Sequence, residues 1–299
     1  MKTLSTYDHK YLKYLLLLLI CSLTLSTTAQ TIIPIQISKQ GHLFVKVKVN
    51  GTEGNFIFDT GGGLTVLTKK FADKVKGISK QDGGFTGHRA NGERLDLDLY
   101  TAKELSVGSF IEKQPTVSIL DADFGEIDGL ISLMTFKNQP FTIDLEHQQL
   151  ILETIKSMSI RKQSAKTIAL QLHADRDKSL DVFAYIKLDT LTLQFMLDSG
   201  AGNDVFRIHS KYMAALGIDK NDTTSVQTVY HKSETNANLQ SAIYKAILRE
   251  LHFKDAPSVS KTKFTGRFED GLIYDGIMSI NWIGKQLSFD LAKKKLYVK

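Results

Sequence analysis

Two stretches of twenty residues decide the fold: FVKVKVNGTEGNFIFDTGGG over residues 44–63 and FAYIKLDTLTLQFMLDSGAG over residues 183–202, which align without a gap. Each begins with alternating apolar and polar residues, the period of a half-buried strand. After a turn, each continues into an apolar run that is typical of a strand buried on both faces. Each then ends in an aspartate, a hydroxyl residue and a glycine. The sequence therefore predicts the same pair of strands twice in one chain.

The similarity continues downstream of both stretches. A short helical pattern follows each of them, FADKV closed by Gly77 and KYMAAL closed by Gly217. Further on come the matching segments DGLIS and DGIMS, and each is followed by a second apolar strand pattern that ends in an aspartate. Order and spacing thus repeat over the whole of both halves, which indicates two copies of one fold.

These repeats predict a mostly β protein with two similar β-barrel-like lobes and a cleft between them. We expect the N-terminal lobe over residues 30–153 and the C-terminal lobe over residues 167–299. A polar, basic linker over residues 154–166 joins them.

The first 29 residues have the pattern of a secretory signal peptide. Lysines precede an apolar run, Leu15–Leu25, which is too short to span a bilayer unaided, and the small residues Thr27 and Ala29 offer a cleavage site. Cys21 lies inside this run behind a large residue, which disfavours lipid anchoring there. We therefore expect export, to the periplasm or out of the cell.

The composition excludes several other classes of protein. Hydrophobic residues make up 42% and charged residues 23%, which is ordinary for a globular chain, and a single cysteine excludes a disulfide scaffold. The net charge is +6 with scattered lysines, so no nucleic-acid partner is expected. The histidines lack metal-ligand spacing, and neither a phosphate-binding loop nor a serine-hydrolase elbow occurs. We expect neither a metal nor a cofactor.

Asp59 and Asp198 end the two matched apolar strands. An approximate two-fold axis relating the halves would bring these carboxyl groups together, and two carboxyls that close share one proton. The ionised aspartate could take a proton from a water molecule, while the protonated one hydrogen-bonds the carbonyl oxygen of an amide. The residue pattern thus indicates acid–base hydrolysis.

The residues that follow each aspartate fit this arrangement. Gly61 and Gly200 allow a tight turn and offer N–H donors to the carboxyls. Thr60 and Ser199 either cross-link the two loops through their hydroxyls or serve simple turn chemistry.

FIFDTGGGLTVLT and FMLDSGAGNDVF resemble the two active-site loops of pepsin- and retropepsin-type aspartic peptidases. DGLIS and DGIMS resemble the partner strands of those loops, and the likeness covers about residues 31–299. It implies a bilobed aspartic-protease fold, Asp59 and Asp198 as the catalytic pair, and a polypeptide substrate. The second loop resembles those of the retropepsins more than those of the pepsins, which implies two retropepsin-like halves fused into a single chain. A monomer with two pseudo-symmetric lobes is therefore expected.

Two departures from that family affect the expected chemistry. Gly62 and Ala201 stand where many pepsin-like members carry a hydroxyl that hydrogen-bonds the carboxylate, and loss of such donors raises a carboxyl pKa. We therefore expect a weakly acidic to neutral pH optimum.

The segment GGFTGHRANGERLDLDL suits a β-hairpin flap with Asn91-Gly92 as a two-residue turn. It has no tyrosine, and Phe85 is the candidate substitute; an ordinary surface hairpin fits the pattern equally well.

The leading hypothesis is an exported aspartic endopeptidase. The alternative is a catalytically degenerate relative of the same fold that binds peptides or other ligands without cutting them. A third hypothesis is an envelope-associated interaction module in which the aspartate pair is only a structural hydrogen-bond hub.

Overall fold

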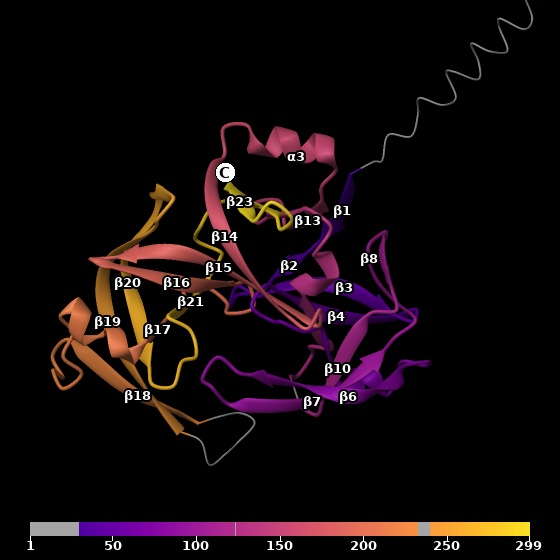
Figure 1. Cartoon of the computed structure of the whole chain (residues 1–299), viewed down its shortest axis with the longest axis horizontal. Helices are drawn as coiled ribbons and strands as arrows, with labels where there is room; N and C mark the ends of the chain where they lie inside the picture. Colours follow the sequence, from indigo (N-terminus) through magenta and orange to yellow (C-terminus); the bar gives the residue numbers. More distant parts are fainter. Residues whose placement is uncertain (1–29, 123, 233–239) are drawn as a thin grey trace, which may run out of the picture. The chain divides into compact units, whose positions relative to one another are not determined.

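A computed structural model describes residues 30–122, 124–232 and 240–299 of the chain (Figure 1). The predicted signal peptide, with Cys21, lies outside the described residues. Residues 31–299 form a single unit. Strands account for 56% of the structure and helices for 8%, in two large sheets, which confirms the prediction of a mostly β fold.

A ten-stranded sheet, together with two short helices, is built from the N-terminal half in the order β6-β7-β10-β5-β11-β4-β3-β8-β9, with β2 paired to β3. Its strands are β2 (Gln36–Ile37), β3 (Leu43–Val49), β4 (Thr52–Asp59), β5 (Val66–Thr68), β6 (Ser79–His88), β7 (Arg94–Thr101), β8 (Glu104–Val107), β9 (Phe110–Lys113), β10 (Thr116–Leu120) and β11 (Gly129–Ser132). The helices are α2 (Lys69–Ala72) and the 3-10 turn η1 (Leu133–Phe136).

A thirteen-stranded sheet has the order β1-β13-β12-β22-β23-β14-β15-β16-β21-β17-β20-β19-β18. Its strands are β1 (Thr31–Pro34), β12 (Phe141–Asp144), β13 (Gln149–Leu152), β14 (Lys166–Asp175), β15 (Ser179–Leu188), β16 (Leu191–Asp198), β17 (Phe206–His209), β18 (Val226–Lys232), β19 (Gln240–Phe253), β20 (Ala256–Glu269), β21 (Gly276–Ser279), β22 (Gln286–Asp290) and β23 (Lys295–Val298). The remaining helices are α3 (Ile155–Lys162), η2 (Ser210–Tyr212) and η3 (Ala214–Leu216).

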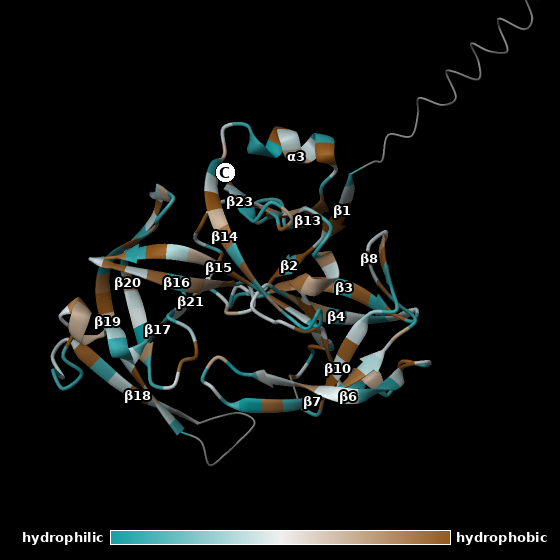
Figure 2. Cartoon of the chain, in the orientation of Figure 1, coloured by the Kyte–Doolittle hydropathy of each residue, from teal (hydrophilic) through white to brown (hydrophobic). Residues whose placement is uncertain are grey.

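The repeat seen in the sequence is a repeat of strand pairing. In the first half β4 lies between β3 and β11, and in the second half β16 lies between β15 and β21. Buried and exposed residues alternate along β3, as the period of its sequence predicts, and Figure 2 shows the same alternation of colours along strands of both sheets.

β11 runs parallel to β4, and β21 runs parallel to β16, in the same register. Gly129 and Gly276 open these two partner strands beside a phenylalanine of the buried strand. A Cβ atom on Gly129 would lie 2.5 Å from the Phe56 ring, and one on Gly276 would lie 2.4 Å from the Phe195 ring. The glycine of each DG segment is therefore required by close packing against the strand that carries the aspartate.

Strands from both predicted lobes share one sheet. β12 and β13 come from residues assigned to the N-terminal lobe, and they pair edge to edge with β22 and β23 through β12 and β22. At this junction the rings of Phe141 and Phe289 stack with their centroids 5.0 Å apart, and the hydroxyls of Thr142 and Ser288 lie 2.8 Å apart. The two halves are thus joined by backbone pairing as well as by the linker.

The predicted linker contains a helix. α3 begins after Thr154, whose side chain accepts a hydrogen bond from the backbone N–H of Ser157 and so caps the first turn. Its end is followed by β14, which begins at Lys166, the last residue of the predicted linker.

Within the described ranges, no helix has the length and apolar character needed to cross a membrane.

Candidate active site

The two repeated strands end at one place. β4 and β16 end at Asp59 and Asp198, and the two carboxyl groups lie within reach of each other, so that they can share a proton. Each carboxyl also accepts a backbone N–H from two residues further along its own chain. Gly61 donates to Asp59 Oδ1 at 2.9 Å, and Gly200 donates to Asp198 Oδ1 at 2.7 Å. The structure therefore brings together the four residues that the sequence placed at the centre of the site.

The two glycines also touch the opposite carboxyl. A Cβ atom on Gly61 would lie 2.6 Å from Asp198 Cγ, and one on Gly200 would lie 2.7 Å from Asp59 Cγ. Real Cβ atoms do not approach other atoms this closely, so only glycine fits at either position. This close approach of the loops holds the two aspartates side by side.

Thr60 and Ser199 cross-link the two loops through four buried hydrogen bonds. The Thr60 hydroxyl donates to the Leu197 carbonyl at 2.6 Å and accepts the Ser199 N–H at 2.9 Å. In the reciprocal pair, the Ser199 hydroxyl donates to the Phe58 carbonyl at 2.6 Å and accepts the Thr60 N–H at 2.9 Å. Of the two interpretations drawn from the sequence, the geometry agrees with the cross-link; we call these four bonds the loop clamp.

Burial raises the pKa of both aspartates of the pair. Desolvation is the largest cause for each, and the pKa of Asp198 rises further because the negative charge of Asp59 lies next to it. The N–H groups of Gly61 and Gly62 and the charge of His42 oppose the rise at Asp59. Protein surrounds most of each carboxyl group, but both residues remain partly exposed to solvent. The pair can thus hold one proton between two carboxyls that a water molecule can reach.

The predicted flap is a hairpin of β6 and β7, but its turn differs from the prediction. Arg89 and Glu93 close the hairpin through an N–H to carbonyl bond of 2.8 Å, so the loop has three residues, Ala90, Asn91 and Gly92. A two-residue turn of the preferred type needs positive φ at both residues. Here Gly92 has φ +82° whereas Asn91 has no positive φ, so a three-residue loop forms with glycine in the left-handed position.

Phe85 lies on β6, below the tip of this hairpin, rather than at the tip. Its side chain is buried against Leu64 and Leu99 of its own half. The guanidinium of Arg176, from the turn between β14 and β15, lies 4.6 Å from the ring centroid and covers it. Phe85 therefore supports the base of the hairpin.

The tip of the hairpin docks on the C-terminal half. The Ile273 N–H donates to the Ala90 carbonyl at 3.1 Å, and Gly92 approaches Gly271. Ala90 also packs against a small apolar cluster whose buried members are Phe183, Met196, Leu272 and Ile277, with Tyr274 beside it. We call this set the Phe183 cluster. The hairpin thus reaches from one half of the molecule to the other.

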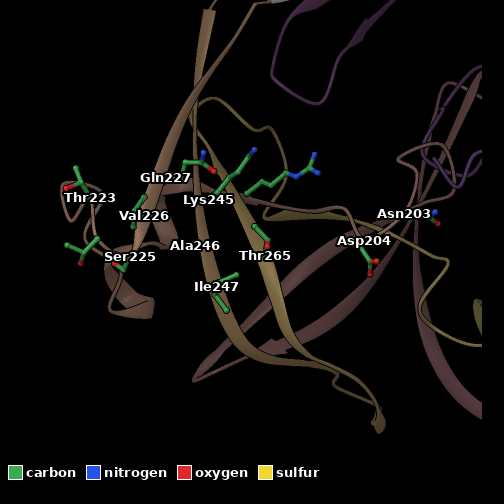
Figure 3. Close-up of a pocket in the computed structure, with 12 residues that line it drawn as sticks. Asn203, Asp204, Thr223, Ser225, Val226, Gln227, Lys245, Ala246, Ile247 and Thr265 are labelled. Carbon is green, nitrogen blue, oxygen red and sulfur yellow. The ribbon is translucent and has the colours of Figure 1, made fainter. Parts of the chain in front are cut away.

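Two surface hollows lie outside the aspartate pair. The larger has a volume of about 660 Å³ and begins at Asn203 and Asp204, just beyond the Asp198 loop. It extends over β18, β19 and β20, and Lys245 and Thr265 are among the residues that line it (Figure 3). The second, of about 610 Å³, is lined by Asn91 of the hairpin tip together with Tyr230 and Gly271. Neither hollow includes Asp59 or Asp198, which lie at the junction of the two loops.

In the part of the chain that the structure describes, no group of three or more histidine, cysteine, aspartate or glutamate side chains could hold a metal ion.

Sequence reasoning overlooked two side chains that flank the aspartate pair. His42 and Asp181 occupy equivalent positions of the two repeats, each two residues before the first phenylalanine of the aligned stretches. A Cβ atom on Gly63 would lie 3.2 Å from Asp181 Oδ1, and one on Gly202 would lie 3.6 Å from His42 Cε1. An ionisable residue at the same position of both repeats was the signal available in the sequence.

The fold and the site define a two-lobed β protein whose repeated loops meet in a pair of carboxyls. Residues 45–135 match the model of a family described as aspartyl protease. This segment holds the first loop, the hairpin and β11, and the structure repeats the same loop at Asp198. The match supports an aspartic peptidase family of the retropepsin-like kind for this chain, and with it a protease-like function. No curated protein matches the chain.

Proposed function

We propose that this chain is an exported aspartic endopeptidase that hydrolyses peptide bonds with a water molecule activated between Asp59 and Asp198. The observation that carries the proposal is the paired geometry of the two carboxyls, held by the loop clamp on strands from separate repeats. Export rests on the sequence of residues 1–29 alone.

The pair divides the work between an acid and a base. Burial raises the pKa of both carboxyls, so the pair shares one proton, and one aspartate is protonated while the other is ionised. The ionised aspartate takes a proton from water as the water oxygen bonds to the amide carbon, and the protonated one gives its proton to the carbonyl oxygen. The resulting diol then breaks its C–N bond as the proton taken from water passes to the leaving nitrogen. One diol hydroxyl returns its proton to the other aspartate, which leaves a carboxylic acid, an amine and a pair that again shares one proton. No bond forms between the enzyme and the substrate.

The test is cleavage of a denatured protein by the chain lacking residues 1–29, across pH 3 to 8, beside an Asp59→Asn variant. We expect cutting by the parent alone, fastest at weakly acidic to neutral pH. A rate that still rises below pH 3 would contradict the expected optimum. Absence of cutting at every pH would favour the ligand-binding alternative.

Gly200→Ala is expected to lower activity by about 100-fold or more, because the new Cβ atom would lie 2.7 Å from both carboxylate oxygens of Asp59. The carboxyls would have to separate, and the shared water would lose its position. Steady-state cleavage of a quenched fluorescent peptide measures the effect. Gly87→Ala is the matched control, since a Cβ atom there meets its nearest neighbour at an ordinary 3.4 Å. Full activity of Gly200→Ala would show that the loops are not held as closely as described.

A further inference from the structure

Asp181 lies beside the loop that carries Asp59. It stands on β15, and the N–H of its neighbour Leu180 donates to the Gly63 carbonyl at 3.2 Å. Its own Oδ1 atom is 3.2 Å from the position of a Cβ atom on Gly63. The negative charge of Asp59 is close enough to raise the pKa of Asp181, although burial is the larger cause. Asp181 is therefore a third carboxyl at the edge of the proposed reaction centre.

Asp181 has only a weak partner for its charge. His173 lies opposite it on β14, with Nδ1 3.5 Å from Asp181 Oδ2, and is charged only when protonated. The side chain of Asp181 is 13% exposed, whereas that of His173 is 67% exposed. Among the described residues, no lysine or arginine forms an ion pair with Asp181. A largely buried carboxylate without a permanent cation is costly to keep, since burial favours paired charges.

An apolar wall adjoins this carboxylate. Phe183 is two residues further along β15, so its side chain leaves the sheet on the same face as that of Asp181. The Phe183 ring lies 5.3 Å from the Tyr274 ring, centroid to centroid. Burial raises the pKa of the Tyr274 hydroxyl, and the negative charge of Asp181 raises it further, which places this hydroxyl in the field of the carboxylate. The rings of Phe183 and Tyr274 thus lie next to Asp181, so that an apolar pair has an anionic group at its end.

The hairpin tip covers the same surface. Ala90 packs on the Phe183 cluster, and Ala90 is a small residue held by one backbone hydrogen bond to Ile273. To reach Phe183, a side chain of a bound polypeptide would have to take the place of Ala90 on this cluster, which costs that contact and the hydrogen bond to Ile273.

We propose that Asp181 is a specificity-determining residue that selects a lysine or arginine of the polypeptide substrate next to the bond that is cut. The aliphatic stem of that side chain packs along Phe183 and Tyr274, and its terminal charge pairs with Asp181. This inference rests on the proposed function, and it adds a class of substrate to it. A purely structural Asp181, which only orders the β14–β15 hairpin through His173, would affect stability without affecting selection.

The test measures binding, so that it does not depend on hydrolysis. The probes are peptides in which a hydroxyethylene group replaces the amide that would be cut. Lysine, norleucine or glutamate stands at the residue before this group or at the residue after it. Their Kd values are measured by calorimetry at pH 7 with the parent, with Asp181→Asn and with His173→Gln. We expect the parent to prefer lysine over norleucine by about tenfold at one of the two positions, the effect of a charge-assisted hydrogen bond. Asp181→Asn should lose that preference and bind the norleucine peptide within about twofold of the parent.

His173→Gln is the control for an indirect effect, and it should keep the preference for lysine. Three results would overturn the inference: equal binding of the three peptides by the parent, no binding of any of them, or a preference that survives in Asp181→Asn. Cleavage of matched amide peptides then reports on the proposed function separately. Selective binding without cutting would refute the proposed endopeptidase but support selection by Asp181. Cutting without selection would support the endopeptidase but refute selection by Asp181.

Discussion

Asparagine in place of either Asp59 or Asp198 is expected to lower kcat/KM by about 10²- to 10⁴-fold, the range of a lost general acid or base, while making the folded chain more stable at neutral pH. Asparagine keeps the shape of the side chain but neither takes nor gives the proton that the reaction moves. The gain in stability has a separate origin, the cost of keeping charge in a buried pair.

The pH dependence of that gain follows from the direction of the pKa shifts. Folding raises the pKa of both carboxyls, chiefly through burial, so the folded chain binds protons more tightly than the unfolded chain. Stability is then greatest below the unfolded pKa of about 3.9 and falls as the pH rises toward the folded values. Above the folded pKa values, the loss of stability caused by the buried charges no longer changes with pH. Asparagine does not titrate, so its advantage should be present at pH 7 and vanish at pH 3.

Thermal unfolding of the parent and of both variants at pH 3 and pH 7 measures this difference in melting temperature. Asp189→Asn is the control, because Asp189 is an exposed turn residue between β15 and β16 and its positive φ suits asparagine. Equal melting temperatures at pH 7 would show that the pair does not strain the fold. A variant that retains full activity would remove the carboxyl pair from the mechanism.

Thr60→Val and Ser199→Ala are each expected to destabilise the fold by about 2–6 kcal/mol. Both side chains are fully buried, and each hydroxyl bonds one carbonyl and one N–H from the opposite half. Removing either hydroxyl leaves two buried backbone groups without partners, at about 1–3 kcal/mol for each group. Urea unfolding of the two variants and of the parent gives the free energies.

Thr192→Val is the matched control for the clamp, because Thr192 is exposed on β16 and should change stability little. The double variant should cost less than the sum of the two single changes, since the two hydroxyls belong to one network. Strict additivity would mean that the two hydroxyls act independently rather than as one clamp.

The repeat made the centre of the site predictable from the sequence. Strands that end at Asp59 and Asp198 follow directly from apolar runs bounded by turns, and their pairing follows from the repetition of those runs. The glycines after each aspartate predicted a tight turn, and the structure shows in addition that they let the two loops approach each other closely. Asp181 was overlooked although an ionisable residue at the same position of both repeats was a signal; no local pattern shows that β15 passes beside the loop that carries Asp59.

Other differences between prediction and structure have local causes. The Asn91-Gly92 pair is typical of a two-residue turn, but only Gly92 takes positive φ, and the loop gains Ala90. The linker was predicted from its polar composition alone, and the capping residue Thr154 was not weighed. The sheet shared by β12 and β22 joins strands 145 or so residues apart, a pairing that strand patterns do not specify.

Covalent continuity between the halves has a consequence for an enzyme that needs one carboxyl from each. An assembly of two separate chains would fall apart on dilution and lose its reacting pair, whereas here each loop meets its counterpart at a local concentration set by the tether and the shared sheet. Turnover per molecule would then stay constant however sparse the protein becomes. Such a design would suit the exported enzyme proposed above, since separate partners seldom meet in a large volume.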